Sequence, residues 1–166
     1  MAELAQLDWI AIVSRWAHIL AAITAVGGTI FMRMALVPSV GVLPDDERKK
    51  LHEQVRSRWV KFVMAAILFL LVSGLYNFVQ KNNQGLRPAY HMLFGIKFLL
   101  AFIIFFLASA LTGRSPAFAN IRANARFWLS LNMTLAIIVV CISGVLRAIP
   151  LKGAAPQPVQ AAPPAK

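Results

Sequence analysis

Cysteine is almost missing from this chain of 166 residues, which contains only Cys141. A single cysteine excludes an internal disulfide, a thiolate metal cluster and the Cys-x-x-Cys-His motif that attaches haem covalently. Because Cys141 lies within an apolar stretch, we expect it to be buried there as a small apolar residue.

Charge is scarce as well. Charged residues make up 14% of the chain and hydrophobic residues 59%, with a mean hydropathy of +0.68. This composition excludes an ordinary soluble domain and predicts an integral membrane protein. The first eight residues contain acids but no base, so we expect no cleavable signal peptide.

Four apolar stretches are long enough to cross a bilayer, whose hydrocarbon core needs about 20 residues per helix. They cover residues 9–38, 59–79, 88–112 and 127–149. Lipid cannot satisfy backbone polar groups, so each stretch must be helical. The sequence therefore predicts an all-α, four-helix membrane bundle that forms one domain over residues 1–149.

Basic residues are distributed unevenly between the two ends of this predicted bundle. One end of the bundle contains the connections from the first span to the second and from the third to the fourth. The basic residues at that end are Arg33, Arg48, Lys49, Lys50, Arg56, Arg58, Lys61, Arg114, Arg122 and Arg126. Excess Lys and Arg mark the cytoplasmic side, so we expect both termini on the outer, periplasmic side of a bacterial inner membrane. The net charge of +11 then favours contact with anionic membrane lipid, and no basic surface suited to nucleic acid is predicted.

Little of the chain lies outside the predicted spans. Residues 45–58 have acids first and then apolar residues one helical turn apart, which predicts a short amphipathic helix leading into the second span. Residues 150–166 are rich in Pro and Ala, and we expect this tail to be disordered. Function must therefore reside within the bundle or at its rim.

Four ionisable side chains inside or near the rim of the spans are candidates for function: Arg15, His18, His91 and Lys97. Such residues are costly in a membrane and usually functional. By helical rise, His18 lies roughly 22 Å above Arg33, and Lys97 roughly 25 Å above Arg114. His18 and Lys97 are thus expected at the same depth, whereas His91 lies near the outer interface.

A histidine that faces a second nitrogen donor across a helical bundle can hold haem b. His18 is the first donor, and Lys97 or His91 the second. Near the outer surface, Arg15, Arg87 or Arg147 could pair with the porphyrin propionates. Each residue also has a plain structural interpretation. His18 could bond a neighbouring helix, Lys97 could extend toward the surface, and His91 could sit at the interface.

Small residues recur within the spans, including Gly27 with Gly28, Ser73 with Gly74, and Ser143 with Gly144. They allow helices to approach closely, or they make room for a planar macrocycle. The sequence does not decide between these two uses.

Several of these residues resemble two related membrane families. Residues 16–22 (WAHILAA) and 26–28 (VGG), followed by Arg33, resemble the first helix of the copper-resistance D (CopD) family. They are similar too to the membrane-integral protoporphyrinogen oxidase (HemJ) family, in which a His is followed ten residues later by Gly. Residues 73–77 (SGLYN) resemble the end of the second helix in the copper family.

Lys97, within GIKFLL at residues 95–100, stands where both families place a lysine. In the oxidase family, the resemblance implies a role for His18 and Lys97 in haem binding or activity. One position differs, because that family has Asn followed by Glu where this chain has Asn132 followed by Met133.

Copper transport is the alternative that the resemblance implies. Soft ligands suit Cu(I), and His18, His91 and Met92 are the metal-ligating candidates. Met32 and Met34 cannot chelate one ion together, because residues two apart on a helix point in nearly opposite directions.

Our interpretation is a four-helix membrane protein with a haem b or redox site between the first and third spans, acting in electron transfer or membrane-linked oxidation. Copper transport and a structural or assembly role without cofactor remain the alternatives. The partners left open are lipid, a second copy of the chain in a homodimer, and a quinone, porphyrin or copper ligand.

Overall fold

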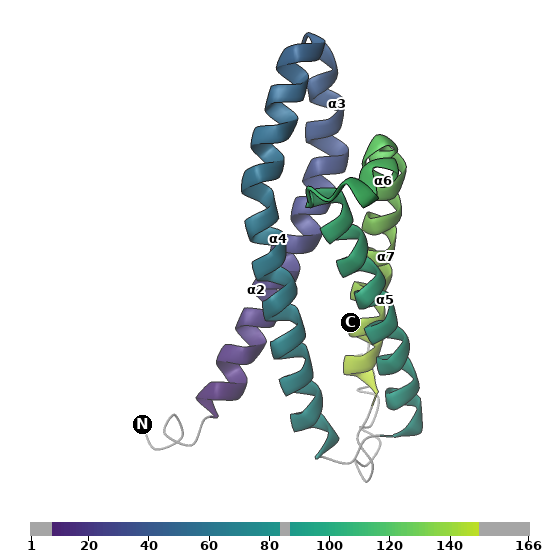
Figure 1. The fold of residues 1–166 in the computed structure, drawn as a ribbon. Coiled ribbons are helices and arrows are strands. Elements are labelled where there is room, and N and C mark those ends of the chain that lie inside the picture. Colours follow the sequence, from purple (N-terminus) through teal and green to yellow (C-terminus); the bar gives the residue numbers. More distant parts are fainter. Residues whose placement is uncertain (1–7, 84–86, 150–166) are drawn as a thin grey trace, which may run out of the picture.

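Helices make up the regular structure of residues 8–83 and 87–149, the part of the chain that the computed structural model describes (Figure 1). The four long helices of this part are α2 (Trp9–Phe31), α4 (Asp45–Asn82), α5 (Pro88–Thr112) and α7 (Ala125–Ala148). Each belongs to a helical segment long and apolar enough to cross a membrane, which is typical of a multi-pass membrane protein. The predicted all-helical architecture is therefore confirmed.

Short helical segments connect the long ones. A π-helix over Met32–Leu36, a single turn α3 (Val37–Ser39) and a 3-10 turn (Val40–Val42) extend α2 without a break. A 3-10 turn (Pro116–Phe118) and α6 (Ala119–Ala123) join α5 to α7. The predicted amphipathic helix before the second span is the first part of α4.

Local chemistry explains where the long helices begin. The Asp8 side chain accepts a hydrogen bond from the Ala11 backbone N–H at 3.0 Å, which caps α2. The α4 helix follows Pro44 and has three acids in its first turn, where negative charge stabilises the positive end of the helix dipole. Pro88 occupies the first turn of α5, where its missing N–H costs nothing.

The helices form two antiparallel hairpins that pack against each other. α2 pairs with α4, and α5 pairs with α7; α4 also contacts α5, and α2 contacts α7. Figure 1 shows α3 and α6 at one end of the bundle, with the start of α2 and the end of α7 at the other. We call these the connector end and the terminal end.

Small and large apolar residues share the buried positions, with Tyr90, Leu107 and Leu146 among the large ones, and many other large apolar residues face outward. The buried residues include Ala21, Ala66, Ala110 and Ala136. Many Leu, Ile, Val and Phe side chains are exposed along all four helices, as expected where lipid covers them.

Two of the glycines meet a neighbouring side chain. Gly28 lies under the Trp59 ring and Gly74 lies beside His18, whereas Gly27 and Gly144 face open space. Cys141 is exposed on α7, so the expectation that it is buried was wrong. Hydropathy marks a membrane span, but it does not tell which side of the helix faces lipid.

Candidate functional site between α2, α4 and α5

His18 lies half-buried on α2 and is held by α4. Its Nδ1 lies 2.9 Å from Ser73 Oγ, a hydrogen bond between the two helices of the first hairpin. The imidazole ring also lies beside Gly74, where a Cβ atom would stand 3.3 Å from His18 Cε1. A small residue at position 74 therefore leaves room for the ring, and Ser73 sets its orientation.

The hydrogen bonds of Ser73 determine which nitrogen of His18 carries the proton. The Ser73 hydroxyl donates its single proton to the Phe69 carbonyl, one turn earlier on α4. With that proton on the Phe69 carbonyl, Ser73 Oγ accepts from the imidazole, which corresponds to the tautomer that carries its proton on His18 Nδ1. In this tautomer the lone pair is on Nε2, as in histidines that ligate metals while Nδ1–H is anchored by a second group.

Lys97 lies half-buried on the inward side of α5 and close enough to His18 for the two groups to interact electrostatically. The contact between Phe78 of α4 and Phe94 of α5, whose ring centroids are 4.0 Å apart, gives their relative levels. Measured from it toward the connector end, Ser73 is about 7.5 Å away and Lys97 about 4.5 Å away by helical rise. His18, bonded to Ser73, and Lys97 thus lie at nearly the same level.

Ser14 lies one helical turn from His18 on the same side of α2. Its Oγ is buried and has no hydrogen-bond partner among the residues described. A buried hydroxyl without a partner is uncommon in folded proteins and leaves a polar group available beside His18.

More cations surround this pair at the terminal end. Lys81 lies close enough to Arg15, Arg147 and Lys97 to interact electrostatically with them, and its Nζ is 5.2 Å from the centre of the Tyr90 ring. Within residues 8–83 and 87–149, the only acid at this end is Asp8, which caps α2. The arrangement can therefore accept a ligand that carries carboxylates.

His91 and Met92 lie on the exposed side of α5. Met92 is 64% exposed, and the edge of the His91 ring meets Phe78 with centroids 6.2 Å apart. His91 stands about 120° around the helix from Lys97, since six residues separate them. Hence the structure brings Lys97, rather than His91, to the side of α5 that faces the bundle.

The described residues include no group of three or more His, Cys, Asp or Glu side chains that could hold a metal ion. Met32 is half-buried and Met34 is exposed, so these two side chains lie on different sides of their helix.

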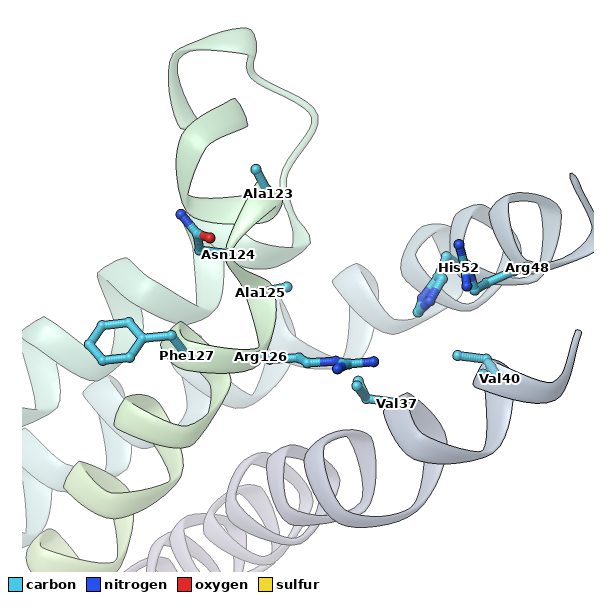
Figure 2. Close-up of a pocket in the computed structure, with 10 residues that line it drawn as sticks. Val37, Val40, Arg48, His52, Ala123, Asn124, Ala125, Arg126 and Phe127 are labelled. Atoms are coloured by element: carbon cyan, nitrogen blue, oxygen red, sulfur yellow. The ribbon is translucent and has the colours of Figure 1, made fainter. Parts of the chain in front are cut away.

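A cavity of about 500 Å³ lies at the connector end, far from His18 along the bundle (Figure 2). Its walls come from the end of the α2 extension, from α4 and from the start of α7. The sequence predicted neither this cavity nor the role of Ser73, because both depend on which helix faces which.

Comparison of the chain with protein-family models, with curated proteins and with solved structures finds no match. The function proposed below therefore depends on the residues and their geometry.

Proposed function

We propose that this chain holds a haem b group or a similar redox centre between α2 and α5, which His18 would ligate, and that it serves electron transfer or oxidation of a membrane-soluble substrate. The observation that supports this proposal most is the hydrogen bond between His18 Nδ1 and Ser73 Oγ at 2.9 Å. It orients the ring and leaves Nε2 to coordinate iron.

The other donors suit the same ligand. Lys97 stands at the level of His18 and supplies a second nitrogen once its amine has lost a proton. The aromatic rings of Phe78 and Phe94 offer a flat apolar wall nearby. Arg15 and Arg147 can bind the propionate carboxylates at the terminal end.

When bound, haem supplies a one-electron carrier whose potential depends on its axial ligands. The chain contributes the rest: Ser73 fixes the ring of His18, the helices exclude water, and the cations balance the carboxylates. A quinone or a porphyrin-like molecule is the class of substrate that reaches such a site through the membrane, in keeping with the resemblance to the CopD and HemJ families.

The proposal includes an orientation. The connector end carries the excess of basic residues and faces the cytoplasm, so the site lies in the outer half of a bacterial inner membrane. A homodimer within that membrane is compatible with the exposed apolar surface.

Absorption spectra of the detergent-solubilised protein, oxidised and reduced, test the proposal. The chain has three histidines, which provide matched controls. His18→Ala should abolish the Soret band, whereas His52→Ala at the connector end should leave it unchanged. His91→Ala should also retain it, since His91 lies on the outer side of α5.

A Soret band that survives in His18→Ala would contradict the ligand assignment. A colourless preparation whose expression changes copper uptake or copper tolerance would favour copper transport instead. A colourless, metal-free preparation that purifies with a stable partner would favour a structural or assembly role.

A further inference from the structure

A groove separates the two hairpins at the connector end. Its main part, the cavity of about 500 Å³, is lined by Val37, Val40, Gly41, Arg48, His52 and residues 123–127. A smaller hollow of about 210 Å³ is lined by Arg33, Val37, Pro38 and Arg126. Val37 and Arg126 line both spaces, so the two form one continuous groove.

Arg126 is the central cation of this groove. Figure 2 shows its side chain extending from α7 toward Val37, with His52 and Arg48 on the far wall. Its guanidinium makes no ion pair or hydrogen bond with the described residues. A guanidinium has five N–H donors, so Arg126 can bind an anion in two-pronged fashion.

Neighbouring basic groups add to the positive charge. Arg33 Nε donates to Ser130 Oγ at 2.6 Å, which leaves its terminal nitrogens available. Arg48 forms an ion pair with Asp45, so its charge is largely balanced. Arg33, Arg126 and His52 therefore face the groove without an acid of their own among the described residues.

The groove lies at the end of the apolar spans, where we expect lipid head groups. Tryptophan is typical of membrane interfaces, and two tryptophans lie toward this end of the bundle. Trp128 is two residues from Arg126, and Trp59 packs over Gly28 of α2. Apolar side chains from Val37 and Val40 lie next to the basic groups (Figure 2). This combination matches a phospholipid, whose phosphate adjoins acyl chains, better than it matches a small soluble anion.

We propose that this groove binds an anionic phospholipid, with Arg126 and Arg33 on the phosphate and the acyl chains along the apolar wall. Basic pockets between transmembrane helices on the cytoplasmic side recognise anionic lipids in this manner. Because the groove lies between the hairpins, the bound lipid contacts both. The proposal is independent of the redox site at the terminal end.

Thermal unfolding of the purified full chain in detergent tests this proposal. Phosphatidylglycerol should raise Tm, whereas phosphatidylcholine with the same acyl chains and inorganic phosphate at equal concentration should not. Arg126→Gln should weaken the apparent affinity for phosphatidylglycerol at least about tenfold, which corresponds to the loss of one strong charge-assisted contact.

Arg58→Gln is the matched control, because Arg58 is exposed at the same end and does not line the groove. This variant should respond to phosphatidylglycerol as the parent does. If Arg126→Gln has a lowered Tm without lipid, Arg126→Lys is used instead, and native mass spectrometry measures the lipid that it retains. Lysine keeps the positive charge but cannot bind phosphate through two parallel N–H groups, so this variant should retain an intermediate amount of lipid.

An equal response of Arg126→Gln and the parent would overturn the proposal. Equal stabilisation by phosphatidylcholine would show an effect of acyl chains alone, and equal stabilisation by inorganic phosphate would show a site for a soluble anion. Either result also rejects an anionic phospholipid as the occupant.

Discussion

Gly27 and Gly28 are adjacent in the first span but meet different surroundings, which makes them a sensitive test of how α2 packs on α4. A Cβ atom added at Gly28 would overlap Cη2 and Cζ2 of the Trp59 ring, whereas one added at Gly27 meets no heavy atom within 4 Å. Overpacking costs about 1–3 kcal/mol. Replacing Gly by Ala inside a helix also raises helix stability by up to about 1 kcal/mol, and this gain applies at either position.

Because the helix-propensity gain is common to both variants, the difference between Gly28→Ala and Gly27→Ala isolates the steric cost. We expect Gly28→Ala to be less stable by about 1–3 kcal/mol. For a chain of this size that is a Tm lower by about 2–12 °C. Circular dichroism of the detergent-solubilised variants during heating measures it.

The same pair in a Trp59→Leu background supplies the control. A smaller side chain at position 59 frees the space over Gly28, so the two alanine variants should then unfold at similar temperatures. Equal Tm values in the parent background would refute the packing of Trp59 on Gly28. A difference that persists in Trp59→Leu would assign it to another cause.

The remaining predictions concern the site, the core and the orientation. Ser73→Ala should cost only about 0.6 kcal/mol of stability, the average for hydrogen bonds between membrane helices. It should nevertheless weaken haem retention about 10- to 100-fold, as measured by Soret absorbance on dilution. Ser143→Ala is the control, because the Ser143 hydroxyl bonds only its own helix, and it should leave stability and haem retention unchanged. Asn132→Leu removes a buried carbonyl oxygen that has no partner within the described residues, so Tm should stay the same or rise, and a large fall would mean that this amide has an unseen partner. A cysteine in place of Gln54, in a cysteine-free background, should react with an impermeant maleimide only after the cells are permeabilised. Labelling in intact cells would show that the orientation is the reverse of the one proposed.

The sequence predicted the bundle well because hydropathy and helix length determine it. The third span was predicted at 88–112, and α5 runs over Pro88–Thr112. The second span was predicted at 59–79, whereas α4 covers Asp45–Asn82, because the amphipathic segment continues into the span as one helix. The ends of an apolar stretch mark where the chain enters and leaves the membrane, but they do not mark where the helix begins and ends.

The partners of individual residues could not be predicted in the same way. Ser73 was recognised only as a small residue, and its bond to His18 depends on the relative rotation of α2 and α4. Likewise, Arg126 was counted among the basic residues that orient the chain, and only the arrangement of the two hairpins places it in a groove. Spacing along a chain gives the depth of a residue in the membrane, but the side of the helix that meets a neighbour comes from packing.

A shortage of acids connects the two proposed sites. The chain has 17 Lys and Arg residues and six Asp and Glu residues. Among the described residues, the single ion pair joins Arg48 to Asp45, and the other acids of α4 lie in its first turns. Arg15, Lys81 and Arg147 at the terminal end, and Arg33 and Arg126 in the connector-end groove, therefore form no ion pair with a carboxylate among the described residues. Because uncompensated charge next to a low-dielectric core is costly, each group favours an anion from outside: carboxylates of a cofactor at one end and lipid phosphate at the other.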